Sequence, residues 1–537
     1  MNATYNWKDL FFYASVFLFA VSLPFAEFMV SISTGLIFVS WLLTGGFAEK
    51  GKRLVNQPAA MLLISIFFVY VVGILFTHDQ SLAIYELQKT VFILALPLCL
   101  STGPVINYQM FRKITLSFLI SLNLATLVAI VRLAFREQFA IQDIWEILFV
   151  SHIRFTLQVL LGISLVINEL YHNTSLRKGL RALLMADILY LIGFLFILKS
   201  LTGLVTLALL LVIHLVFFIP KIRTRKWKLL SVLMLSMMII GGFSYIGWSV
   251  HRFYNTPQVD LNQLPKKTQN GNLYHHDPSN KIIENGHYVG LYICEEEMQK
   301  SWEQRSSLGY HQADQSGFPV SATLIRYLTS KGLTKDSAGM AKLLPEDITY
   351  IEKGIANHIY TQRFLSLYPR LYQTIWEVDV YLKTGDPNMK SLAKRIEFGK
   401  AALTIIGQHP LFGVGTGNWK QAFVDAYHTN QSKLDPAEYA SSHNQYLNYL
   451  VKFGILGFLW IMFAWVAPLF LTNKHRFYPV LMLLLIVGIS NFSDSNLEAH
   501  MGISFFVFFY SFFLFSQTQQ VGHPSLNSKG KNEHPST

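Results

Sequence analysis

Apolar residues occur along this chain in blocks of about twenty residues, separated by short polar loops. A helical block of this length covers the hydrocarbon core of a bilayer and satisfies its own backbone hydrogen bonds there. The pattern therefore predicts an all-α polytopic membrane protein with twelve transmembrane helices. The predicted spans are residues 10–26, 28–46, 58–76, 88–102, 114–133, 155–170, 182–199, 203–220, 229–249, 449–471, 477–492 and 499–517.

Basic residues gather in every second loop between these blocks. Lys and Arg collect in the cytoplasmic loops of membrane proteins, so this alternation indicates that both termini are cytoplasmic. The first block lacks the basic segment and the cleavage signal of a signal peptide, and we interpret it as a retained span. The clusters are Lys50, Lys52 and Arg53; Arg112 and Lys113; Arg177, Lys178 and Arg181; Lys221, Arg223, Arg225, Lys226 and Lys228; and Lys474 and Arg476.

A long polar insert interrupts the apolar blocks between residues 250 and 440, and it faces outward in this topology. Its first part is turn-rich. In the remainder, apolar residues recur at three- and four-residue spacing, which indicates amphipathic helices. We expect nine membrane helices over residues 1–249, a large, mostly helical periplasmic loop domain over 250–440, three membrane helices over 441–517 and a disordered cytoplasmic tail over 518–537.

Composition narrows the function classes. Hydrophobic residues make up 52% of the chain and charged residues 14%, which excludes a soluble globular protein. Most of the basic excess lies in short loops, so the net charge of +12 indicates membrane orientation rather than nucleic-acid binding. Cys99 lies in an apolar block and Cys294 in the insert, so the two cysteines offer no disulfide framework.

The stretch SSHNQYLNYLVKFGILG at residues 441–457 leads from a polar segment into an apolar block. We expect Ser441 or Ser442 to cap a helix that His443 opens. The helix dipole would disfavour a cationic imidazole there, which leaves a neutral ring suited to a general base. Gly454 would share the helix face of His443 and allow close packing. The alternative is a polar interfacial histidine above a packing motif.

Several cations lie at the outer side of the predicted membrane helices. Arg395, in the insert, offers a planar fork for a diphosphate, with a solvated surface arginine as the alternative. Arg154 and Lys199 lie at the outer ends of two spans, where snorkelling and anion binding are both open. Arg326, Arg363 and Arg370 add further cations to the insert.

The segment HPLFGVGTGN at residues 409–418 contains closely spaced glycines. No strand precedes it and no Lys-Ser or Lys-Thr follows it, so it does not predict a nucleotide-binding loop. The backbone N–H groups around Gly413 and Gly415 form either an anion-binding nest or a purely structural turn. We count His409 with these two glycines as candidate binding residues.

The carboxylates do not predict a metal site. Glu377 and Asp379 are two residues apart, which directs them to different sides of a helix. Asp494 and Glu498, at the outer end of the last two spans, either stay near the surface or pair with a cation. Because the sequence has no His or Cys ligand cluster, we expect no metal and no other cofactor.

His443 and Asn444, followed by nine residues and then Gly454-x-x-Gly457, resemble the His-Asn-x9-Gly-x-x-Gly signature of O-antigen ligases and the related O-antigen polymerases. The HPLFGVGTGN turn is similar to one in the same family, and Arg395 occupies the position of the family's loop arginine. The segments NGHYVGLYICEEEMQKSW, TLIRYLTSKGL and NLEAHMGISFF resemble the Bacteroidetes branch.

The resemblance implies a metal-independent, inverting glycosyltransferase of the GT-C type in the bacterial inner membrane. It would move a glycan from undecaprenyl diphosphate to an acceptor hydroxyl, such as that of a lipid A-core sugar, at the periplasmic face. His443 would be the base or orient the acceptor, and Arg395 would hold the diphosphate. We count as further candidate substrate-binding residues Asn444, Arg154, Lys199, Arg326, His409, Gly413 and Gly415.

Two positions depart from the family's pattern. Leu201 stands where an arginine is common, and Lys199 is the candidate to supply that charge; Gly399 stands where a tryptophan is common. O-antigen polymerase and protein O-oligosaccharyltransferase stay open as alternative functions. A membrane transporter is a more distant alternative, because the ionisable residues gather at the outer ends of spans and in the insert rather than at mid-membrane.

Overall fold

The computed structural model describes residues 6–135, 146–173, 175–219, 224–256, 259–361 and 366–517. Within these ranges the regular structure is almost entirely α-helical, which confirms the predicted all-α class. Lys221, Arg223, Arg363 and the predicted tail at 518–537 lie outside the described residues. The short exceptions to α-helix are strands β1 (Ile283–Glu284) and β2 (His287–Tyr288), which pair antiparallel, and the 3₁₀ turns η2 (Leu261–Gln263), η3 (His358–Thr361), η4 (Pro436–Glu438) and η5 (Asn496–Glu498).

A helix lies at each of the twelve predicted spans. They are α1 (Trp7–Ser22), α2 (Glu27–Leu43), α4 (Pro58–Ile74), α5 (Gln80–Thr102), α6 (Tyr108–Ala134), α8 (His152–His172), α9 (Lys178–Leu198), α10 (Leu201–Phe218), α11 (Arg225–Tyr254), α19 (Gln445–Leu471), α20 (Tyr478–Ser490) and α21 (His500–Phe515). In the described part of the chain, α5, α6, α8, α9, α11 and α19 are long and apolar enough to cross a membrane.

Other apolar helices fall short of that length or bend. α2 and the following α3 (Phe47–Val55) make a further candidate span if the 112° bend between them lies within one crossing. α4, α10, α20 and α21 are apolar but shorter. By length and composition the chain is thus an integral membrane protein, and the count of twelve spans stays a prediction.

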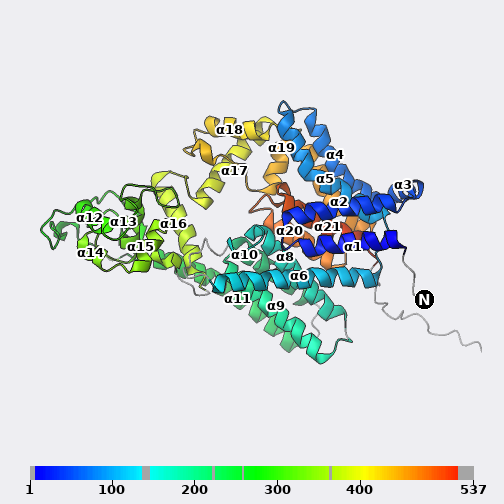
Figure 1. The fold of residues 1–537 in the computed structure, drawn as a ribbon, viewed down its shortest axis with the longest axis horizontal. Helices are drawn as coiled ribbons and strands as arrows, with labels where there is room; N and C mark the ends of the chain where they lie inside the picture. Colours follow the sequence, from blue (N-terminus) through cyan, green and yellow to red (C-terminus); the bar gives the residue numbers. More distant parts are fainter. Residues whose placement is uncertain are drawn as a thin grey trace, which may run out of the picture.

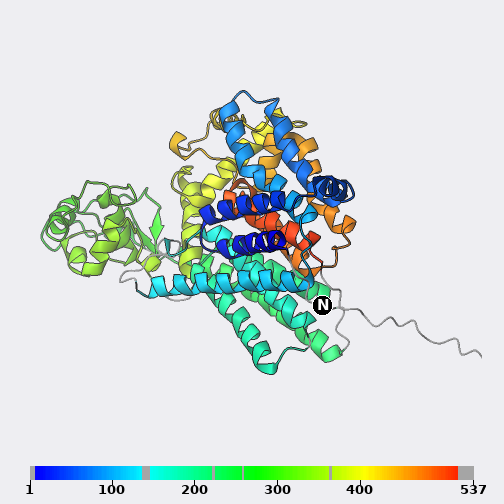
Figure 2. The ribbon, with the colours of Figure 1, turned by 45° about the vertical axis from the view of Figure 1, so that its right-hand side comes forward.

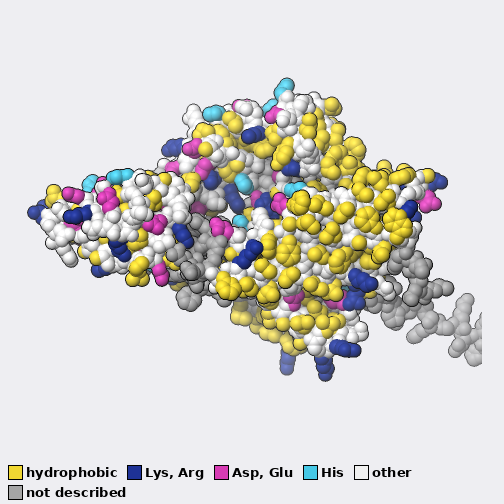
Figure 3. All heavy atoms as spheres, viewed as in Figure 1, with side chains coloured by type: hydrophobic (Ala, Val, Ile, Leu, Met, Phe, Trp, Pro, Cys, Tyr) yellow, Lys and Arg dark blue, Asp and Glu magenta, His cyan; other side chains and the backbone are white. Residues whose placement is uncertain are grey.

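The helical bundle is built around α21, whose side chains are buried on nearly every face. Aromatic rings stack against it: Phe508 meets Phe19 of α1 with ring centroids 4.2 Å apart, and Phe512 meets Phe111 of α6 at 5.0 Å. The surrounding helices keep apolar side chains on their outward faces, and Figure 3 shows a broad hydrophobic surface over this part of the molecule. Lipid-facing helices have this pattern.

The insert contains a separate helical lobe that projects away from the bundle. It lies at the end opposite α3, which carries Lys50, Lys52 and Arg53, as Figures 1 and 2 both show. The lobe has its own buried core, which includes Trp302 and Tyr327. Its helices are α12 (Glu295–Glu303), α13 (Val320–Ser330), α14 (Ser337–Ala341) and α15 (Pro345–Glu352).

Three further helices, α16 (Tyr368–Thr384), α17 (Ser391–Gln408) and α18 (Trp419–Thr429), connect this lobe to the bundle. α16 contacts α11, and α17 lies against α16, α18 and α19. Phe398 and Ile405 of α17 share a core with Phe423 of α18 and Val451 of α19. This packing brings α17 beside the start of α19.

α19 is interrupted at Gly454, whose φ of 62° and ψ of −169° are not helical. The turn at residues 409–418 fills the interruption, so the backbone polar groups that the break releases find partners. The bonds run from Val414 N to Val451 O (2.9 Å), from Gly415 N to Lys452 O (2.9 Å) and from Ile455 N to Pro410 O (2.8 Å).

We expect Gly454→Ala to lower the free energy of unfolding by at least ~1–3 kcal/mol, because alanine is strained at this positive φ. A Cβ there would also lie 2.3 Å from the backbone of Leu411. Thermal unfolding of the detergent-purified protein measures the loss. Gly407→Ala in α17 is the control, because a Cβ there meets no atom within 4 Å. Equal stability of the two variants would contradict the role given to Gly454.

Candidate active site

His443 lies in the loop directly before α19, with a φ of 49°. Because this backbone conformation is not helical, α19 begins only after Asn444, which is its N-cap. The Asn444 side chain accepts hydrogen bonds from the N–H groups of Tyr446 (3.0 Å) and Leu447 (3.1 Å). The predictions that a serine caps this helix and that His443 opens it are wrong. The predicted helix face shared by His443 and Gly454 is wrong for the same reason.

Asp494, in the connection between α20 and α21, links His443 to Arg154. Its Oδ1 lies 3.3 Å from Nδ1 of His443, and its Oδ2 lies 3.2 Å from Nη2 of Arg154 in the first turn of α8. The Asp494 side chain is 5% exposed, whereas that of His443 is 42% exposed. The three residues form a chain from a mostly buried arginine to an imidazole that solvent or a substrate can reach.

Asp494 stays ionised in this arrangement. Burial by itself raises the pKa of its carboxyl, but the hydrogen bond with His443 and the charge of Arg154 more than offset burial, so the pKa lies below its usual value of 3.8. A carboxylate that accepts a hydrogen bond from Nδ1–H orients the imidazole and leaves the lone pair of Nε2 for a substrate proton.

α17 places two further side chains beside His443. The ring of Phe398 stacks on the imidazole, with centroids 5.4 Å apart and planes 24° apart. Arg395 is half-buried and lies one helical turn before Phe398, so it shares that side of α17. Arg395 makes no hydrogen bond or ion pair with any other described residue, which leaves its guanidinium available to a ligand.

Arg370 of α16 and His152 of α8 extend this basic cluster. Burial lowers the pKa of Arg370, Glu377 opposes that shift, and the nearby charge of Arg395 adds to it. His152 lies within electrostatic range of Arg370, Arg395 and Arg154. Figure 3 shows basic and histidine side chains in the recess between the lobe and the apolar surface. Such a concentration of positive charge suits a ligand that carries phosphate.

The sequence reasoning missed His152, although the residue stands two positions before Arg154 in SHIRF. Lys199 forms the corner between α9 and α10 and is only 2% exposed. Ser493 donates a hydrogen bond to Thr202, in the first turn of α10, at 3.3 Å. The corner that carries Lys199 therefore lies beside the connection that carries Asp494, and anion binding by Lys199 stays a prediction.

Other predicted binding residues serve the fold. Arg326 of the lobe donates to the buried carboxylate of Glu284 at 2.7 Å, so its charge is already paired. The N–H groups of Gly413 and Gly415 donate to backbone carbonyls, the first to that of His409 at 3.1 Å. The structure favours the structural turn over the anion-binding nest, because the N–H groups that an anion needs are occupied.

The bundle of membrane-length helices carries a histidine–carboxylate pair and a basic cluster at one end, an arrangement that suits acid–base chemistry on an anionic ligand. Residues 359–462 match the model of the O-antigen ligase family, so this stretch of the chain is similar to that family. The family is associated with membrane glycosyltransferases of the ligase and polymerase type. The matched stretch includes Arg395, the turn at 409–418, His443 and the break in α19.

An uncharacterized protein of Haemophilus influenzae (strain ATCC 51907 / DSM 11121 / KW20 / Rd) is 26% identical to this chain over 159 residues. The aligned region covers 30% of this chain and 38% of that relative. The chain is thus similar to that protein over a minority of both lengths, and the similarity adds no functional assignment.

We expect Asp494→Asn to remove a pH-dependent part of the stability. The pKa in the folded state is depressed below the unfolded value of 3.8, so the carboxylate stabilises the fold above pH 3.8 and this contribution is lost as the pH falls through the folded-state pKa. In detergent, the wild type should melt above the variant at neutral pH, and the difference should shrink below pH 3.8.

The control for this measurement is Asp425→Asn, which removes an exposed carboxylate on α18 whose hydrogen bond among the described side chains is with Gln421 at 2.9 Å. It should change the melting temperature little at any pH. A difference between wild type and Asp494→Asn that stays constant as the pH falls well below 3.8 would contradict the ionised state of Asp494.

Proposed function

We propose that this protein transfers a glycan from undecaprenyl diphosphate to an acceptor hydroxyl, such as that of a lipid A-core sugar, at the periplasmic face of the bacterial inner membrane. The observation that carries the proposal is the pairing of His443 with Asp494 beside Arg395, whose guanidinium has no ion-pair partner among the described residues. The match of residues 359–462 to the O-antigen ligase family supports the reaction class. The recess beside the apolar surface suits a donor whose lipid tail stays in the membrane.

In the proposed reaction, the acceptor oxygen attacks the anomeric carbon of the donor from the face opposite the diphosphate. A new C–O bond forms, and the bond between the anomeric carbon and the diphosphate oxygen breaks with its electron pair on the diphosphate, which inverts the configuration. The acceptor proton moves to Nε2 of His443. Asp494 accepts from Nδ1–H and stabilises the imidazolium that results.

Diphosphate is a good leaving group, so the protein mainly has to stabilise the charge that develops on it. Arg395 takes this role, and Arg370 contributes positive potential from α16. Arg154 orients Asp494 through their ion pair of 3.2 Å and adds a further positive charge beside it. In this proposal the cations of the chain supply the counter-charge, without a metal ion.

Glycan transfer in a ligase-deficient Gram-negative host tests the proposal. The wild type should attach the lipid-linked glycan of the host to lipid A-core. His443→Ala should lower the rate about 100- to 10,000-fold, the usual contribution of a general base. Arg395→Ala should lower it about 100- to 1,000-fold through lost charge stabilisation. Gels of lipopolysaccharide, at equal protein levels in the membrane, measure the transfer.

Arg112→Ala is the matched control, because Arg112 pairs with Glu169 at 2.6 Å on the exposed surface and should contribute little. A wild type that lengthens the lipid-linked glycan would be a polymerase, and one that modifies a protein would be a protein O-oligosaccharyltransferase. Either result would contradict the proposed acceptor, while the proposed donor and the assignment of the site would still hold. An active wild type that both site variants match would contradict the site assignment.

The proposed function also requires the lobe to be periplasmic. We expect Gln304→Cys, at the end of α12, to react with a membrane-impermeant maleimide in spheroplasts, and Lys52→Cys on α3 to react only after lysis. Both positions are exposed, whereas the native Cys99 and Cys294 are buried and should give little background. The opposite labelling pattern would reverse the orientation and remove the site from the periplasm.

A further inference from the structure

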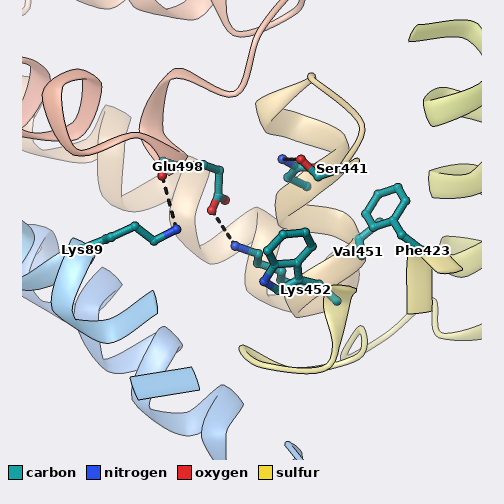
Figure 4. A pocket seen from close by; sticks show the side chains of 8 residues that line it. Lys89, Phe423, Ser441, Val451, Lys452 and Glu498 are labelled. Carbon is teal, nitrogen blue, oxygen red and sulfur yellow. Dashed lines mark hydrogen bonds and ion pairs between the residues drawn. The ribbon is translucent and has the colours of Figure 1, made fainter. Parts of the chain in front are cut away.

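A network of four charged side chains lies beside the first turns of α19. Nζ of Lys452 lies 2.9 Å from Oε2 of Glu86 on α5 and 2.5 Å from Oε2 of Glu498 in η5. Lys89, one turn after Glu86, pairs with it at 2.7 Å and donates to the carbonyl of Glu498 at 3.4 Å. Lys452 is 2% exposed and Glu86 is 1% exposed. Figure 4 shows both lysines directed toward Glu498.

Stability alone does not account for this network. Moving a charge out of water costs several kcal/mol per ion, and replacing a buried ion pair by apolar residues is often neutral or even stabilising. Position 452 lies between Val451 and Phe453, both buried, where an apolar residue avoids that cost. The charges at Lys452, Glu86 and Glu498 are therefore better explained by the geometry that their ion pairs impose than by a gain in stability.

Glu498 ends the connection that carries Asp494. The side chain of Gln445, in the first turn of α19, donates to Oε1 of Glu498 at 3.2 Å and accepts from the N–H of Leu497 at 2.8 Å. These two bonds hold the connection against α19 on the C-terminal side of Asp494. The remaining contacts run from Asn448 Nδ2 to Ser495 Oγ (2.8 Å), from Gln445 N to Asn491 O (2.9 Å) and from Asn444 Nδ2 to Phe492 O (3.1 Å).

On the side that faces α18, the side chain of Glu498 is not held in place by close packing. A cavity of about 70 Å³ lies there, and Lys89, Lys452 and Glu498 line it together with Trp419 and Phe423 of α18. A cavity of this size, with charged and aromatic side chains in its lining, has room for several water molecules. The carboxylate of Glu498 is therefore fixed by two contacts from α19, the ion pair of Oε2 with Lys452 and the hydrogen bond that Oε1 accepts from Gln445.

We propose that Lys452 is a positioning residue for the transfer reaction. By holding Glu498 against α5 and α19, it sets the connection so that Asp494 meets Nδ1 of His443. The inference rests on the proposed function, because it assigns the network to the catalytic pair. Lys452 does not touch the substrate, so its loss changes the orientation of His443 and leaves the donor site around Arg395 intact.

Lys452→Met, which keeps the length of the side chain and removes its charge, tests the inference. We expect kcat for glycan transfer to fall about tenfold to a hundredfold, as a small misplacement of a catalytic group does, with KM for the lipid-linked donor unchanged. Added to Asp494→Asn, Lys452→Met should cause no further loss, because both substitutions act through one contact. A kcat equal to that of the wild type, or additive losses, would overturn the inference.

Lys331→Met is the matched control, since it breaks an ion pair of 2.7 Å with Asp347 in the lobe and should leave kcat unchanged. Where Lys452→Met does not accumulate, the double variant Lys452→Met/Glu498→Gln takes its place. It removes one cation and one carboxylate, which leaves Glu86 paired with Lys89, and it should show the same loss of kcat.

A cross-linking measurement needs no activity. In the double variant His443→Cys/Asp494→Cys, a short bifunctional thiol reagent should link the two positions rapidly, and addition of Lys452→Met should slow the linking several-fold. Slowed linking in a protein whose wild type transfers no glycan would support the positioning role and contradict the proposed function. Unchanged linking, with an active wild type, would overturn the positioning role alone.

Discussion

The break in α19 at Gly454 is the constraint on which the rest of the site depends. A helix that opens among apolar neighbours must find partners for the backbone groups that it releases, and the turn at residues 409–418 supplies them. That turn follows the end of α17 directly, so the bonds that close the break also hold α17 in place. α17 in turn carries Arg395 and Phe398 to His443, which joins the membrane helices to the basic site.

Charge near the start of α19 is arranged in two layers with different tasks. The outer layer contains His443, Asp494 and the arginines, and its excess of positive charge suits an anionic substrate. The inner layer pairs Lys452 with Glu86 and Glu498, so its cations are already neutralised. Balanced buried charges cost desolvation energy but define geometry, whereas unbalanced accessible charges bind and stabilise a charged ligand.

The sequence predicted the helices of the bundle closely, because lipid leaves the backbone few alternatives: the span expected at 155–170 is α8, His152–His172. The sequence wrongly predicted that His443 opens α19, because the spacing of apolar residues does not reveal the positive φ of His443. The sequence did not decide whether Gly413 and Gly415 form an anion-binding nest or a structural turn, because the two structures have the same glycine spacing. They differ in whether the N–H groups donate to an anion or to backbone carbonyls, as they do here.

By itself, the sequence determined the all-α membrane class and singled out His443 and Arg395, because apolar periodicity and residue spacing are local properties. Only the tertiary structure paired Asp494 with His443, 51 residues apart, and Glu86 with Lys452, 366 residues apart. The first contact forms where the connection between α20 and α21 lies beside the segment before α19, and the second forms where α5 and α19 pack together. The residues around Asp494 and Glu86 in the sequence do not predict which cation each carboxylate pairs with. The packing of α5, α8, α19 and α21 therefore determined these ion pairs.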